Sequence, residues 1–146
     1  PLMQKPVHAL MKRFCDEGFE VLIETGGSLD ISVIDPRVIK IMDLKCPSSK
    51  MAHKNLFENI AHLLPHDEVK FVIGTREDYE WAIELIRQYH IQVKCHTILF
   101  SPVFDSIEPV EIVNWMLADQ IQKEIPNLRF QIQMHKMIWS PETKGV

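Results

Sequence analysis

The sequence predicts an α/β fold with a mainly parallel sheet, and three features of the chain indicate it. Helical and strand-like patterns alternate along the whole length, most apolar strand segments end in polar residues or glycine, and no linker interrupts the alternation. Strands that alternate with helices form right-handed βαβ units, whose strands are parallel. A chain of 146 residues, 46% of them hydrophobic, can bury one core. We therefore predict a single domain over residues 1–146.

The helices are predicted from apolar residues that recur every three or four positions, and the strands from short apolar runs. Gly18, Pro65 and Pro126 follow three of the helices, because glycine accepts the conformation of a helix stop and proline cannot continue a helix. Thr75 is a predicted N-cap, with Asp78 in the first helical turn. In order, the expected elements are a helix over 5–17, strands over 19–23 and 38–42, a helix over 52–64, a strand over 68–73, a helix over 76–89, a strand over 94–100, a longest helix from 106 or 108 to 125, and a strand over 128–134.

Polar side chains follow several of the predicted strands at the point where each strand ends. The carboxyl ends of parallel strands meet at one edge of a sheet, and ligands of α/β folds bind at that edge. The polar residues expected along this rim are Glu24, Asp43, Lys45, Ser48, Ser101, Gln133 and His135. Periodicity does not decide whether such a sheet is an open doubly wound fold or part of a barrel.

Glu24 stands two residues before the pair Gly26-Gly27, directly after a predicted strand. Two glycines let the backbone turn sharply and approach a ligand closely. A carboxylate at this place can accept two hydroxyl hydrogen bonds, as the acidic residue that binds a ribose does in dinucleotide folds. The alternative is a plain Gly-Gly turn beside a solvated glutamate.

Composition and missing motifs exclude several classes of function. The net charge is −4, with basic and acidic residues spread through the chain, so we expect neither a nucleic-acid nor a membrane partner. No apolar run approaches the ~18 residues of a membrane span. The three widely spaced cysteines suggest neither disulfides nor a metal knuckle, which favours a reducing, cytoplasmic setting. GxGxxG, GxxxxGK[ST], GxSxG and HExxH are all absent, so dehydrogenase, P-loop, hydrolase and zincin functions lack their motifs.

Five motifs, in order and at suitable spacing, carry a resemblance to a known family. They are residues 24–29 (ETGGSL), 43–49 (DLKCPSS), 67–73 (DEVKFVI), 100–103 (FSPV) and 131–139 (QIQMHKMIW). Together they resemble the carboxyl-terminal two thirds of 7-carboxy-7-deazaguanine synthases, which are radical S-adenosylmethionine enzymes of the queuosine pathway. Each motif is weak alone, but five in register are specific. The resemblance covers nearly the whole chain.

The resemblance implies a fold, a reaction and cofactors. The family has a partial, irregular βα barrel of the radical S-adenosylmethionine type. It converts 6-carboxy-5,6,7,8-tetrahydropterin to 7-carboxy-7-deazaguanine by a radical ring contraction that eliminates ammonia. The expected cofactors are S-adenosylmethionine, a [4Fe-4S] cluster and Mg²⁺. The expected partners are the pterin substrate, an electron donor for the cluster and a second copy in a homodimer.

The resemblance also implies roles for residues of the rim, though no catalytic residue follows from it. Glu24 would contact hydroxyls of the cofactor ribose, and a second group would line the cofactor site: Asp43, Leu44, Lys45 and Ser48. The backbone of a third group would meet the adenine: Ser101, Pro102 and Val103. Gln133 and His135 would face the pterin, whose polar edges suit amide and imidazole groups. Some relatives end near Pro141 with a carboxylate on the substrate, whereas this chain continues to Val146.

The cluster ligands of the family do not appear in this chain. They are the cysteines of a CxxxCxxC loop near the amino terminus, upstream of a Gly-Gly-Glu-Pro motif whose end Pro1-Leu2 resembles. Cys15, Cys46 and Cys95 are 31 and 49 residues apart, whereas cluster thiolates are closely grouped. We therefore expect the chain to be the carboxyl-terminal part of a radical enzyme, to hold no metal and to be inactive by itself.

Two other functions use the same rim. A non-catalytic nucleotide-binding α/β module would bind its ligand with these 146 residues alone. Another radical S-adenosylmethionine enzyme, such as a glycyl-radical activating enzyme, would act on a protein rather than on a small pterin.

Overall fold

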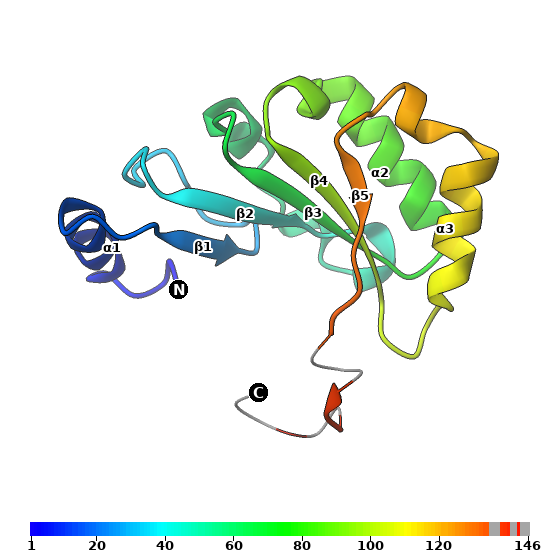
Figure 1. The fold of residues 1–146 in the computed structure, drawn as a ribbon, viewed down its shortest axis with the longest axis horizontal. Coiled ribbons are helices and arrows are strands. Elements are labelled where there is room, and N and C mark those ends of the chain that lie inside the picture. The colour runs from blue at the N-terminus through cyan, green and yellow to red at the C-terminus, as the bar shows by residue number, and fades with distance from the viewer. Residues whose placement is uncertain (135–137, 141–142, 144–146) are drawn as a thin grey trace.

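The computed structural model describes residues 1–134, 138–140 and 143, and its described strands form one parallel sheet (Figure 1). Neighbours in the sheet are neighbours in the chain, in the order β1-β2-β3-β4-β5. The strands are β1 (Leu22–Thr25), β2 (Ile39–Leu44), β3 (Glu68–Ile73), β4 (Thr97–Pro102) and β5 (Leu128–Phe130). A doubly wound sheet reverses its strand order at a switch point, and the described strands show no reversal. The order therefore favours a partial βα barrel.

Two of the helices cover one face of the sheet. The helices are α1 (Val7–Asp16), α2 (Arg76–Tyr89) and α3 (Pro109–Ala118). Figure 1 shows α2 and α3 side by side, and the rings of Tyr79 and Trp115 join them at 5.6 Å. Right-handed crossovers between strands in consecutive order place their helices on the same face, as in a barrel.

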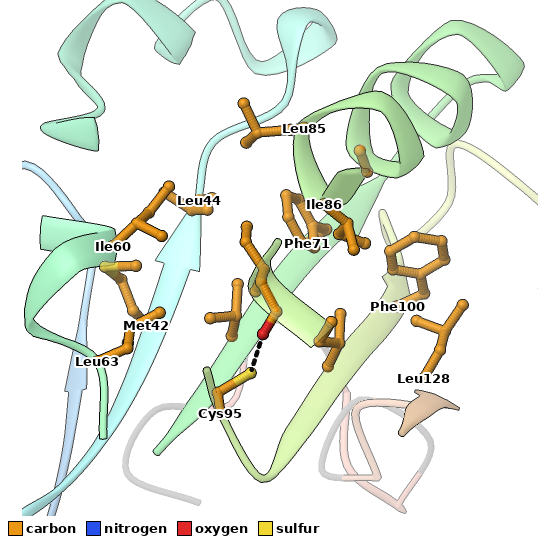
Figure 2. Packing of buried hydrophobic residues seen from close by; sticks show 14 of the residues in the cluster. Met42, Leu44, Ile60, Leu63, Phe71, Leu85, Ile86, Cys95, Phe100 and Leu128 are labelled. Atoms are coloured by element: carbon orange, nitrogen blue, oxygen red, sulfur yellow. Dashed lines mark hydrogen bonds between the residues drawn. The ribbon is translucent and has the colours of Figure 1, made fainter. Parts of the chain in front are cut away.

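The core lies between α2, α3 and the sheet (Figure 2). Strand side chains alternate between the two faces, so every second residue of β2 and β3 is buried. Phe71 of β3 and Phe100 of β4 lie opposite each other in the ladder, with their rings edge to face at 5.7 Å. Both are fully buried beside Ile86 of α2. The side chains of even-numbered residues in β1 and β3 and of odd-numbered residues in β2 share the face away from the helices. The residues between them share the helix-covered face.

The segment expected to form a helix over 52–64 contains only 3₁₀ turns, Ala52–Lys54 and Phe57–His62. Long-range hydrogen bonds of Asn55, Leu56 and Asn59 explain the difference, because an α-helix would direct these groups away from their partners. The Leu56 amide donates to the carbonyl of Gly27 at 2.9 Å. The side chain of Asn55 bonds to the backbone of Lys45, and that of Asn59 to loop residues 27–31.

The boundaries of the other elements agree only in part with the sequence prediction. β3 and α2 match it, and Thr75 caps α2 by accepting the Asp78 amide at 3.1 Å. β1, β2 and β4 end two residues later than expected, and β5 stops at Phe130. The expected longest helix was wrong: α3 ends at Ala118, Gln120 has φ of 49°, and a 3₁₀ turn follows over Ile121–Lys123, so α2 is longer.

Candidate functional site

Three of the predicted site residues lie in strands on the same face of the sheet. Glu24 of β1 pairs with Ile41, two residues before Asp43 in β2. Asp43 pairs with Lys70 of β3, and Val72, two residues later, pairs with Ser101 of β4. Because side chains alternate along a strand, Glu24, Asp43 and Ser101 share the face opposite the buried aromatic rings of Phe71 and Phe100. The register thus places the three side chains on one face of the sheet, and their meeting at one ligand site stays a prediction.

A pocket of about 360 Å³ lies at the carboxyl end of β2. Five of its lining residues were predicted for the cofactor site: Asp43, Leu44, Lys45, Ser48 and Val103. The Lys45 ammonium donates to Asp43 Oδ2 at 2.7 Å, and both side chains are partly exposed. Leu44 is fully buried and its side chain packs in the core (Figure 2), so it can meet a ligand only through its backbone.

Two buried polar atoms on this face have no hydrogen-bond partner among the described residues. They are the second carboxylate oxygen of Asp43, Oδ1, and the hydroxyl of Ser101. Ser101 is fully buried. Buried polar groups in folded proteins are nearly always bonded, so Asp43 Oδ1, whose residue lines the pocket of about 360 Å³, is free to accept a hydrogen bond from a ligand there. A carboxylate and a hydroxyl fit the amino and hydroxyl groups of S-adenosylmethionine.

A second pocket of about 850 Å³ lies beyond the end of β4. Pro102, Val103 and Gln133, all predicted site residues, line it together with Trp115 of α3. Val103 and Ser106 line both pockets, so the two adjoin. The arrangement offers one ligand the Asp43–Lys45 pair at one end and the chain following β4 at the other.

Other predicted residues lie outside the pockets. Glu24 is exposed on β1 and lines neither of the two. Ser101 lies in β4 and lines neither. His135 and Pro141 fall outside the described residues.

Sequence reasoning missed the residues that hold the pocket loops in place. The side-chain amide of Asn55 donates to the Lys45 carbonyl and accepts from the Lys45 amide, both at 2.9 Å. Asn59, buried, accepts from the Ile31 amide at 3.1 Å and donates to the Leu29 carbonyl at 2.8 Å. The sequence carried no signal for either bond, because the partners stand 10 and 28 to 30 residues away. The loop residues 104–109 and Trp115 were not expected in the site either.

The described residues do not fit an iron–sulfur cluster or a Mg²⁺ site. Cys15, Cys46 and Cys95 are free and belong to α1, the end of β2 and the turn before β4. Burial, and then the carboxylates of Asp78 and Asp43, raise the pKa of Cys46, which opposes the thiolate form that iron needs. Across the described part of the chain, no three His, Cys, Asp or Glu side chains gather in a way that could hold a metal ion. The expectation that the chain holds no metal stays a prediction.

None of the described helices combines the length and the apolar character that crossing a membrane requires. This finding concerns helices alone.

Comparisons with known proteins place the chain among enzymes of one name. No family model matches the chain. A 7-carboxy-7-deazaguanine synthase of Koribacter versatilis is 39% identical over 159 residues, covering the whole chain and 68% of the relative. Synthases of the same name from Chlorobaculum tepidum and Clostridium acetobutylicum are 39% and 31% identical, with 65% and 66% of their length covered. The chain thus spans about two thirds of the length of these relatives, and it belongs to the 7-carboxy-7-deazaguanine synthase family.

Proposed function

We propose that the chain is the S-adenosylmethionine- and pterin-binding part of a radical enzyme that forms 7-carboxy-7-deazaguanine. The substrate would be 6-carboxy-5,6,7,8-tetrahydropterin, and the reaction a ring contraction with loss of ammonia. Membership of the family supports the reaction. The adjoining pockets at the carboxyl ends of β2 and β4 support a site in which S-adenosylmethionine spans both pockets and the pterin lies in the part lined by Gln133.

The observation that carries this proposal is the Asp43–Lys45 pair, which lines the pocket at the carboxyl end of β2. Asp43 has one oxygen bonded to Lys45 and one without a partner among the described residues. A carboxylate with a free oxygen can accept from an ammonium group, and the Lys45 ammonium can donate to a carboxylate. S-adenosylmethionine carries both groups on its methionine end, so one pair of side chains can recognise it.

We propose that the remaining site residues act on the two ligands as follows. Glu24 would accept from the ribose hydroxyls and Ser48 would line the methionine end. Ser101, Pro102 and Val103 would meet the adenine, while Gln133 and His135 would face the pterin, with Pro141 near it. When bound, S-adenosylmethionine would supply the radical that starts the ring contraction, with the electron for its cleavage coming from the proposed donor. The residues of this chain bind and orient the ligands and exclude water.

The [4Fe-4S] cluster and Mg²⁺ do not fit the described residues, so we derive no step through them. We propose that residues other than the described ones hold the cluster and Mg²⁺. The described part would then be inactive without those residues. The proposal also includes an electron donor, a homodimer and a cytoplasmic location, supported by the family resemblance alone. Light scattering of the purified protein tests the homodimer.

The proposal is tested with the complete gene product, prepared without oxygen and with its cluster restored. Binding of S-adenosylmethionine is measured by equilibrium dialysis, and turnover of the pterin by chromatography of the product. We expect both, and we expect Lys45→Met to weaken S-adenosylmethionine binding by roughly tenfold or more, because a charge-assisted hydrogen bond is lost. Lys12→Met is the matched control, because Lys12 lies exposed on α1 and pairs only with Asp16 among the described residues.

The two alternative functions give different results in the same experiment. A nucleotide-binding module would bind its ligand with no turnover of the pterin, and its doubly wound form is disfavoured by the strand order. A glycyl-radical activating enzyme would consume S-adenosylmethionine without forming 7-carboxy-7-deazaguanine. A protein that binds no S-adenosylmethionine refutes the proposal.

A further inference from the structure

Asp78 carries a buried carboxylate that is bonded to two loops outside its own helix. It lies in the first turn of α2 and is fully buried. Its Oδ1 accepts from the Ser48 amide at 2.9 Å, and its Oδ2 accepts from the Ser48 hydroxyl at 2.5 Å and from the Gly74 amide at 2.9 Å. Three donors on two oxygens compensate for removing this charge from water.

The two bonded loops belong to the two pockets. Ser48 follows β2 and lines the pocket of about 360 Å³. Gly74 follows β3 and lines the pocket of about 850 Å³. One carboxylate therefore joins the wall of one pocket to the wall of the other, although Ser48 stands 30 residues before it.

The junction around Asp78 is tightly packed at Gly74. A Cβ placed on Gly74 would lie 3.1 Å from the Ser48 hydroxyl and 3.1 Å from a methyl group of Val103. Contacts this close force the neighbours to move. Val103 lines both pockets, so any shift at Gly74 is transmitted to the place where they adjoin.

The bonding of Asp78 differs from that of most acidic residues in the first turn of a helix. Such a residue is usually solvated and interacts with the N–H groups and the dipole of its own helix. In α2 that task falls to Thr75, whose hydroxyl accepts the Asp78 amide. Both oxygens of Asp78 are directed instead to the segments that follow β2 and β3.

We propose that Asp78 is a positioning residue for the S-adenosylmethionine site. It holds the Ser48 loop against the Gly74 turn, and so sets the distance between the Asp43–Lys45 end of the site and the chain after β4. A ligand that spans both pockets binds only when this distance is kept. The inference rests on the proposed function, because S-adenosylmethionine is the ligand that would span them.

The test compares two ligands in Asp78→Asn, made in the complete gene product. Asparagine keeps the shape but offers an amide N–H₂ where Asp78 accepts, so one or more of the three donors loses its partner. We expect the Kd for S-adenosylmethionine to rise by roughly tenfold or more and the Kd for the pterin to stay within about twofold. Hydrogen exchange of the Ser48 and Gly74 amides should become faster. Glu84→Gln, an exposed position on the same helix, is the control and should change neither Kd.

Gly74→Ala perturbs the same junction with Asp78 intact, and it decides the question if Asp78→Asn does not fold. It should also weaken S-adenosylmethionine binding selectively, because its Cβ would displace Ser48 or Val103. Equal weakening of both ligands in Asp78→Asn would show a general structural role, and unchanged S-adenosylmethionine binding would show no role; either result overturns the inference. Absence of binding in the unmodified protein would instead refute the proposed function itself, and the inference with it.

Discussion

Replacing Asp67 by asparagine should destabilise the fold more than any surface charge substitution does. Asp67 is fully buried at the amino-terminal end of β3, and the Lys40 side chain, 2% exposed, lies beside it with its ammonium 2.9 Å from Oδ2. The same carboxylate accepts from the backbone amides of Lys40 at 2.8 Å and Leu64 at 2.7 Å. It therefore ties together β2, β3 and the turn before β3.

The magnitude follows from what Asp67→Asn leaves behind. The Lys40 ammonium would remain buried without its counter-charge, and the Leu64 amide or the ammonium would face an N–H₂ group. Breaking a buried ion pair by removing one partner costs about 3–5 kcal/mol. For a chain of this size that corresponds to a fall in Tm of roughly 10 °C.

The assay is urea unfolding of the purified protein, followed by circular dichroism, with Glu124→Gln as the control. Glu124 accepts two hydrogen bonds from Arg87 at 2.7 Å, but both side chains are largely exposed. Exposed ion pairs contribute about 0–1 kcal/mol to the free energy of unfolding. The double variant Lys40→Met/Asp67→Asn should be more stable than the sum of the single losses implies, because it leaves no unpaired charge.

Two results would refute this reasoning. The first is a loss of less than about 1 kcal/mol in Asp67→Asn, equal to that of the surface control. The second is strict additivity in the double variant, which would mean that Lys40 and Asp67 do not depend on each other.

Four further predictions concern the core, a strained turn and, in two cases, the thiols. Phe71→Ala should cost about 3–5 kcal/mol of unfolding free energy, measured in urea, because Phe71 is fully buried between strands and α2. Gly27→Ala should lower the unfolding free energy by about 1–2 kcal/mol, because Gly27 has φ of 69° and the added Cβ would lie 3.1 Å from a backbone oxygen of β2. A thiol reagent at pH 8 should label the partly exposed Cys15 first, because Cys46 and Cys95 are buried. Burial, and then nearby carboxylates, raise the pKa of Cys95 to about 12 and also raise that of Cys46, so stability should be retained below the unfolded thiol pKa of about 8.5 and fall as the pH rises above it.

Each of these has a contrary outcome. A loss below about 1 kcal/mol in Phe71→Ala would mean that the ring is not packed in the core. Unchanged stability of Gly27→Ala would mean that the left-handed turn is absent. Fast labelling of all three thiols in the folded protein, or stability that rises between pH 8 and 10, would contradict the burial of Cys46 and Cys95.

The local parts of the site were predictable because their signals lie within a few residues. Lys45 and Ser48 stand directly behind the apolar run of β2, so their place at its carboxyl end followed from the strand pattern, whereas Asp43 and Ser101 were expected after their strands and lie within them. The boundaries of β3 and α2 followed for the same reason, and so did the Thr75 cap. Glu24 was expected after its strand and lies within it, since a short apolar run does not mark where pairing stops.

The sequence by itself determined the α/β class, the alternation of elements and which residues end up at the carboxyl edge of a parallel sheet. The physical reason is that periodicity and capping are set by neighbours in the chain. Only the tertiary structure decided the strand order, the loss of the helix expected over 52–64 and the joining of the two pockets. Those depend on hydrogen bonds between distant segments, such as Asn55 with Lys45 and Asp78 with Ser48, and no local pattern encodes the partner of a side chain 10 or 30 residues away.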